Sequence, residues 1–268
     1  MMERIAMEIS DNIIMMPFKP KRPYQELGLI LRQELTDGHY SIGDRLPPER
    51  DIAERLEVSR TVVREAIIML ELENLVEVKK GSGVYVINIP NQSPHHERII
   101  TDDAGPFEML QARQLLESNI AEFAALQVTP GDIAQMRAAL KLERQELAAQ
   151  SEYCIGDEQF HMSIAEATHN SVLVDMLKNS WERREQSPMW KKLHSHIIGN
   201  DYRQEWMEDH TRILAAMQRK DPVMAKSAMW QHLENVKQRL LELSDIDDPN
   251  FDGYLFNSNP VLLFGGEQ

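Results

Sequence analysis

Cysteine is nearly absent from the chain: Cys154 is the single one among 268 residues, which excludes an internal disulfide. Long hydrophobic runs are absent too, because no apolar stretch approaches the ~20 residues that a membrane-spanning helix requires. The first 18 residues carry more acidic than basic side chains and lack the basic start and apolar stretch of a secretion signal. These absences exclude a membrane protein and predict a protein of the reducing cytoplasm.

A surplus of basic charge is also lacking. The net charge is −14, whereas a DNA-binding protein needs cations that replace the counterions of the phosphate backbone. The acidity is unevenly distributed, however: residues 19–89 carry 11 basic and 12 acidic side chains, while residues 90–268 carry 17 and 28. The first part of the chain is therefore close to neutral and can still present a basic face to DNA.

The length of the chain fits two compact domains, and its residue patterns divide it accordingly. We expect a mainly α-helical protein with an N-terminal winged helix-turn-helix, which includes a small β-hairpin wing, and a C-terminal all-α helical bundle. The expected segments are a poorly ordered extension at 1–20, a DNA-binding domain at 21–89, a linker at 90–105, a helical ligand-binding and dimerisation domain at 106–245 and a tail at 246–268.

Three short helices followed by a hairpin are predicted in the N-terminal domain. Apolar residues follow one helical face over residues 24–35, and the proline pair at 47–48 opens a second helix before the third. The period then changes from 3.6 to 2 at residues 76–79 and 84–87, on either side of a glycine-rich turn. In a winged helix-turn-helix the third helix enters the major groove and the hairpin contacts the backbone or minor groove.

The third predicted helix has an apolar face and a basic face. Its apolar stripe is Val63, Ala66, Ile67 and Leu70. Ser59 can cap its first turn, and Arg60, Thr61 and Arg64 share a face about a third of a turn away. Two arginines one turn apart can reach base edges, because a guanidinium group matches O6 and N7 of guanine. With phosphate contacts from the second helix and the wing, the predicted DNA-binding residues are Arg50, Ser59, Arg60, Thr61, Arg64, Lys80, Gly81 and Ser82.

An arginine on an exposed helix face is usually a solvated charge, so spacing alone does not decide between DNA contact and simple solvation. Three strings of sequence argue further: LPPERDIA at 46–53, VSRTVVREA at 58–66 and KGSGV at 80–84. Together they closely resemble the winged helix of the GntR family of transcription regulators. One departure is Asn74, where that family commonly has glycine, and asparagine tolerates the left-handed conformation next best.

Acidic and imidazole side chains at helical spacing indicate a metal site in the C-terminal domain. Asp157 and His161 lie four residues apart on one helix face, and His210 and His232 fall on later helices. One carboxylate and three imidazoles suit zinc, nickel or manganese, with positions left for a ligand. Spacing alone leaves ordinary surface or core histidines as the alternative, because nine histidines occur in the chain.

Residues 107–243 resemble the FCD ligand-binding domain of FadR-type GntR proteins. The matching motifs are Asp157-x-x-x-His161, His210 before ILAA at 213–216, and His232 within the last helix. The resemblance implies that these four residues hold a divalent metal ion, with zinc preferred over nickel or manganese.

Four strings, GPFE at 105–108, PMWKKLH at 188–194, AMWQHLEN at 228–235 and FDGYLF at 251–256, resemble the enterobacterial repressors of hexuronate catabolism, and the likeness covers nearly the whole chain past residue 22. This resemblance implies a hexuronate-derived acid or a related aldonate as the effector.

Three further residues are candidates for binding that effector: Arg113, Trp190 and His194. Arg113 can clamp a carboxylate in bidentate fashion, or it can form an ordinary helical ion pair with Glu117. Trp190 and His194 lie in the segment 186–206, which we expect between helices, either as a lid on a ligand pocket or as a solvated loop.

These observations predict a homodimeric repressor that binds a palindromic operator and is released when a small carboxylate binds near the metal. A metal-dependent hydrolase fused to a DNA-binding domain is an alternative, although no general base or nucleophile motif accompanies the four ligands. An architectural DNA-binding protein with a structural histidine cluster is a third interpretation.

Overall fold

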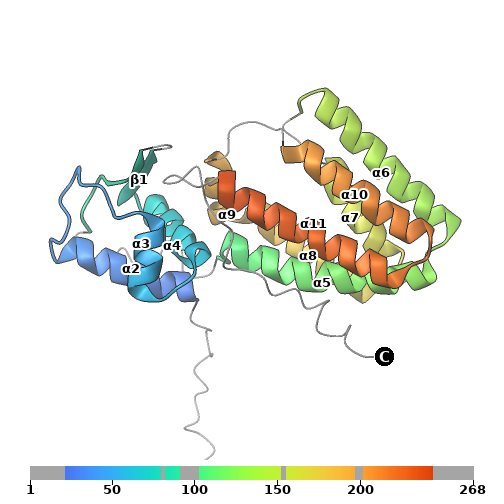
Figure 1. The fold of residues 1–268 in the computed structure, drawn as a ribbon, viewed down its shortest axis with the longest axis horizontal. Coiled ribbons are helices and arrows are strands. Elements are labelled where there is room, and N and C mark those ends of the chain that lie inside the picture. The colour runs from blue at the N-terminus through green and yellow to red at the C-terminus, as the bar shows by residue number, and fades with distance from the viewer. Residues whose placement is uncertain (1–21, 80–81, 91–102, 152–154, 197–201, 244–268) are drawn as a thin grey trace, which may run out of the picture.

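The computed structural model describes residues 22–79, 82–90, 103–151, 155–196 and 202–243, in two helical domains that lie side by side (Figure 1). The predicted extension at 1–20, the predicted tail at 246–268 and most of the predicted linker fall outside these ranges. The predicted fold class, mainly α-helical with a winged helix-turn-helix and an α bundle, is confirmed. In the described ranges no helix is both long and apolar enough to cross a membrane.

The N-terminal domain contains the helices α2 (Pro23–Thr36), α3 (Glu49–Leu56) and α4 (Arg60–Leu72), followed by the antiparallel strands β1 (Val76–Lys79) and β2 (Gly83–Val86). The strands pair Val76 with Val86 and Lys79 with Gly83, as expected for a hairpin. Asn74 has φ 57°, so asparagine occupies the left-handed position between α4 and the hairpin that glycine commonly takes.

The C-terminal domain is a bundle of seven helices in the described residues: α5 (Pro106–Gln127), α6 (Pro130–Ala148), α7 (Ile155–Glu166), α8 (Ser171–Gln186), α9 (Pro188–Ser195), α10 (Tyr202–Gln218) and α11 (Pro222–Leu243). Helices α5 and α11 pack along each other, α6 packs on α7, and α10 packs on α11 (Figure 1). The facing sides of α7, α10 and α11 hold the polar site described below.

The segment 186–206, expected between helices, contains the short helix α9 instead. Ser187 caps it, since its Oγ accepts a hydrogen bond from the backbone N–H of Trp190 at 3.0 Å, and Pro188 occupies its first turn. Met189 and Leu193 are completely buried, so α9 is a packed element and not a solvated loop.

Helix α4 lies between the two domains. Its predicted apolar stripe is buried as expected, with Val63 and Ile67 fully inaccessible against the core of the N-terminal domain. The opposite face is also covered: α4 packs against α5 and α9 of the C-terminal domain, and Ile68 is fully inaccessible there. One continuous hydrophobic cluster therefore joins both domains through this helix.

Candidate metal centre and recognition helix

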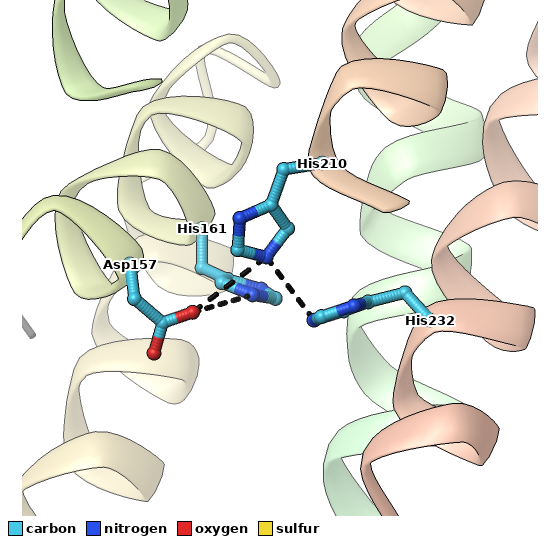
Figure 2. A group of neighbouring side chains, drawn as sticks. All are labelled: Asp157, His161, His210 and His232. Atoms are coloured by element: carbon cyan, nitrogen blue, oxygen red, sulfur yellow. Dashed lines mark hydrogen bonds and ion pairs between the residues drawn. The ribbon is translucent and has the colours of Figure 1, made fainter. Parts of the chain in front are cut away.

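Four side chains from three helices converge in the C-terminal bundle (Figure 2). Asp157 and His161 come from α7, His210 from α10 and His232 from α11, and one donor atom from each lies within 4.8 Å of all the others. Asp157 Oδ1 is 3.6 Å from the Nε2 atoms of both His161 and His210, and His210 Nε2 is 3.2 Å from His232 Nε2. The structure thus brings together all four residues that the sequence indicated.

Each histidine of this centre has a carboxylate at its other ring nitrogen. Nδ1 of His161 bonds Glu117, and Nδ1 of His210 lies 2.9 Å from Glu143. Nδ1 of His232 lies 3.4 Å from a carboxylate oxygen of Asp209. A carboxylate at Nδ1 favours the tautomer with its proton there, which directs the lone pair of Nε2 into the centre.

The donor set fits a divalent metal ion. With Nδ1 protonated, the lone pairs of His210 and His232 face each other at 3.2 Å, an arrangement that a shared cation stabilises. His161 Nε2 is buried and has no hydrogen-bond partner among the described residues, although buried polar atoms are nearly always paired. Three neutral imidazoles and one carboxylate are the ligands that zinc and neighbouring transition metals accept.

The protonation states of His232 and Asp157 favour their ligand forms, whereas the pKa of His210 is raised, because the nearby carboxylates, Glu143 first, outweigh the effect of burial. Burial and the nearby His210 lower the pKa of His232 to about 3. Burial alone would raise the pKa of Asp157, but His161, His210 and two arginines hold it below its usual range. His232 is therefore neutral and Asp157 ionised at neutral pH, as coordination requires.

A small cavity of about 20 Å³, with room for roughly one water molecule, opens beside the centre. It is lined by Arg113, Asp157, His161, Arg184, Trp190, Trp206, His232, Leu233 and Val236. Small-molecule pockets have the same kind of lining, apolar and aromatic walls with a few placed polar groups, but they are larger, so an organic ligand has to widen this cavity. Two guanidinium groups and two indole rings beside the candidate metal ligands give this lining the chemistry that binds a small organic anion.

Arg113 forms the predicted helical ion pair and also lies at the cavity wall. Its Nε donates to Glu117, the helical ion pair that was one alternative, while its guanidinium also lines the cavity and lies over the ring of Trp181 at 4.2 Å. The carboxylate of Glu117 bonds His161 as well, so it links Arg113 to the metal centre.

Of the other two predicted effector residues, Trp190 lines the cavity and His194 does not. His194 packs beside Trp190, with ring centroids 5.8 Å apart, and burial lowers its pKa to about 4. A neutral His194 thus supports the position of Trp190.

Arg184 and Trp206 line the cavity but were not among the sequence candidates. The guanidinium of Arg184 lies between two indole rings, 4.5 Å from the ring centre of Trp181 and 4.7 Å from that of Trp190. The three outer carboxylates, from Glu117, Glu143 and Asp209, were missed as ligand supports too.

The predicted DNA contacts are divided between exposed and buried positions. Arg50 is 68% exposed on α3, and Ser82 is exposed beside the hairpin. Ser59 caps α4 as predicted, accepting from Val62 N–H at 3.4 Å. Lys80 and Gly81 lie outside the described residues.

The expectation that Arg60, Thr61 and Arg64 face solvent is wrong for this conformation. All three are buried, and the C-terminal domain contacts the same helix through α5, α9 and the end of α11. Arg64 is completely inaccessible and forms an ion pair with Glu49 of α3. A duplex cannot reach these side chains while the two domains are arranged in this way.

Each of the two domains matches a known protein family. Residues 23–86 match the family "Bacterial regulatory proteins, gntR family", and residues 108–235 match the "FCD domain". The chain is 58% identical over 245 residues to the Uxu operon transcriptional regulator of Escherichia coli K12, covering 90% of this chain and 95% of that one. It is 54% identical to the Uxu operon regulator of Haemophilus influenzae, covering 90% and 91%. It is 49% identical to the Exu regulon transcriptional regulator of E. coli K12, covering 91% and 95%.

These relatives are regulators, which favours regulation over the metal-dependent hydrolase considered above. The two family matches occur in the predicted order, and the relatives span nearly the whole chain. Both findings indicate the same family. The chain therefore belongs to the GntR family of bacterial regulatory proteins and carries an FCD domain behind its winged helix-turn-helix.

Proposed function

We propose that this protein is a cytoplasmic repressor of hexuronate catabolism genes, and that a hexuronate or aldonate bound beside the metal centre releases it from a palindromic operator. The regulators named for the Uxu and Exu systems support this substrate class. The observation that carries the effector site is the meeting of the four-residue centre, two arginines and two tryptophans around one cavity.

The lining residues have complementary tasks toward a sugar acid. Arg113 and Arg184 bind carboxylate or hydroxyl oxygens, since a guanidinium group donates in a fixed fork that matches a carboxylate. Trp190 and Trp206 provide aromatic faces on which the apolar side of a sugar packs. A divalent ion, zinc by preference, held by Asp157, His161, His210 and His232 would supply Lewis-acid affinity for an oxygen of the ligand.

DNA binding uses the residues that the sequence indicated. Arg60, Thr61 and Arg64 read bases in the major groove once α4 is accessible, and Arg50 contacts phosphate. The wing residues Lys80, Gly81 and Ser82 and the cap residue Ser59 complete the proposed interface, with phosphate contacts setting its orientation.

A second copy of the chain is the proposed partner for dimerisation. An exposed apolar stripe runs along α5 and the adjoining α8, which pack on each other. Its members are Leu115, Phe123 and Leu126 of α5 and Val172 and Met176 of α8, each at least 41% exposed. Large exposed apolar patches commonly mark interfaces, and a two-fold dimer would place two DNA-binding domains on a palindrome.

The test is a titration of D-glucuronate, D-galacturonate and D-gluconate into the metal-loaded protein bound to fluorescent operator DNA, with D-glucose as the neutral control. We expect at least one acid, and not glucose, to release the DNA at concentrations that saturate the cavity. Chemical conversion of the acid would favour the hydrolase, and binding of DNA that no acid affects would favour the architectural protein.

A further inference from the structure

The face of α4 that should enter DNA is docked on the ligand-binding domain. Thr61, Glu65 and Ile68 lie opposite the apolar stripe of the helix, and each is at most 8% exposed. Ile68, completely buried, packs in the cluster that includes Met189 of α9 and Leu240 of α11. An isoleucine on this face suits a protein partner and not a phosphate backbone.

Polar contacts along the same helix reach two elements of the C-terminal domain. Arg64 Nη1 donates to the carbonyl oxygen of Leu241, near the end of α11, at 3.2 Å. One carboxylate oxygen of Glu65 accepts the backbone N–H groups of Phe107 and Glu108, at 2.8 and 3.2 Å. Glu65 thus caps the first turn of α5 from the other domain, where the helix dipole favours an anion.

A third contact joins α4 to α9. Glu71 Oε1 lies 3.0 Å from Lys192 Nζ, and its Oε2 lies 2.8 Å from His196 Nε2. Trp190, on the same short helix, lines the effector cavity. Helix α9 therefore reaches the effector site through Trp190 and the recognition helix through Lys192 and its C-cap residue His196. We refer to the contacts of Arg64, Glu65 and Glu71 with the C-terminal domain as the interdomain latch.

We infer that the latch holds the free protein in a closed form that covers Arg60 and Arg64, and that operator DNA selects an open form in which α4 leaves the C-terminal domain. This inference rests on the proposed function, because it explains how the same protein binds and releases its operator. An acid bound against Trp190 contacts α9 directly and stabilises the closed form over the open one. Such a difference in affinity between two forms is what effector-driven release requires.

The first test weakens the latch without touching the DNA-contacting residues. Glu71→Gln keeps the shape of the side chain but removes the charge opposite Lys192, which destabilises the closed form. When the binding-competent form is the minor one, operator affinity rises by the same factor as its population, here about three- to tenfold. Operator Kd is measured by fluorescence anisotropy with the effector absent.

The matched control is Glu77→Gln. Glu77 is an exposed acid on β1, close to the wing, and contacts Lys79 within its own domain. The Glu77→Gln variant measures how much operator affinity is gained merely by removing a negative charge near DNA. A gain for Glu71→Gln alone supports the latch, whereas an equal gain for both variants, or none for Glu71→Gln, overturns it.

The second test locks the latch. Glu71→Cys and Lys192→Cys are combined in a Cys154→Ser background and treated with a short bismaleimide in the absence of DNA. We expect rapid intramolecular crosslinking, protection from it by bound operator, and at least a hundredfold loss of operator affinity in the crosslinked protein. The Lys192→Cys variant in the same background, given the same reagent, should show no such loss.

Failure to crosslink in free protein, or full operator binding by the crosslinked protein, would overturn the closed form. Crosslinking is scored without operator, so it still decides the closed form if the wild type binds no operator at all, the result that refutes the proposed function.

Discussion

His210 and His232 face each other through their Nε2 atoms, 3.2 Å apart, while carboxylates flank their Nδ1 atoms. Two imidazoles oriented in this way present two lone pairs to the same point. This arrangement suits two ligands of the same cation, and it is the clearest physical reason to expect a metal in this bundle.

Replacement of a ligand should remove the metal. His161→Ala is expected to lower the metal content of protein purified without chelators from about one ion per chain to a small fraction, and to weaken the effector response. Metal content is measured by elemental mass spectrometry. The control is His169→Ala, because His169 is about half exposed and lies outside the centre. Wild-type protein that contains no transition metal would contradict the assignment.

An outer carboxylate should tune the affinity of the centre. Glu143→Gln removes the charge beside His210 Nδ1 while preserving a hydrogen-bonding group of the same size. We expect a 10- to 100-fold weaker metal affinity, typical for loss of such a support, in a competition titration with a chelator. An unchanged affinity would mean that Glu143 serves only packing.

Arg184 should matter chiefly to the effector, although its guanidinium also lies 4.0 Å from a carboxylate oxygen of Asp157. Arg184→Gln is expected to weaken hexuronate binding about tenfold in calorimetry, because a charge-assisted contact is lost from the cavity wall. Its neighbour Arg183 is exposed and lines no part of this cavity, so Arg183→Gln is the matched control. Equal effects of the two variants would place the effector elsewhere.

The pH dependence of stability should carry a contribution from Glu65. Burial raises the pKa of Glu65 to about 7, although hydrogen bonds from Glu108 and Phe107 oppose the increase. The folded protein then binds this proton more tightly than the unfolded chain, so the contribution favours folding below about pH 4.5 and is lost progressively as pH rises to about 7. The loss is at most ~3 kcal/mol.

Glu65→Gln should remove that contribution, since an amide oxygen can accept the same backbone N–H groups without titrating. We therefore expect the free energy of unfolding of the variant, relative to that of the wild type, to increase as the pH is raised from 5 to 8. Chemical denaturation at each pH measures it. A stability difference that is the same at both pH values would refute the predicted pKa.

Charge on the apolar stripe of α5 should separate the proposed dimer. Leu126→Glu places a carboxylate at the stripe, and burying it unpaired would cost several kcal/mol. We expect a monomer by light scattering at micromolar concentration. Leu29→Glu, at an equally exposed leucine on α2, should leave the mass unchanged. A dimeric Leu126→Glu protein would move the interface elsewhere.

Most of the architecture could be predicted from the sequence, because the apolar and polar side chains recur with the periods of helices and strands. The stripe of Val63 and Ile67 identified the core face of α4, and the Asp157–His161 spacing placed two donors on one helix face. Helix α9 was missed although Ser187 and Pro188 form a recognisable helix start, because the polar residues after it suggested a loop.

The burial of Arg64 could not be predicted from its own helix, because it depends on which surface a second domain covers. Ile68 was the available signal, an apolar residue on the face expected to be exposed. Glu143, Asp209 and Arg184 come from helices far apart in the sequence, and no spacing rule connects them to the histidines.

The proposed coupling between effector and operator is tested most directly by the Kd of one hexuronate for the metal-loaded protein, measured by calorimetry with and without saturating operator. Binding free energies are reciprocal, so operator must weaken hexuronate binding by the same factor by which hexuronate weakens operator binding. We expect a weakening of about tenfold or more. Equal affinities in the two measurements would contradict the coupling of this centre to DNA.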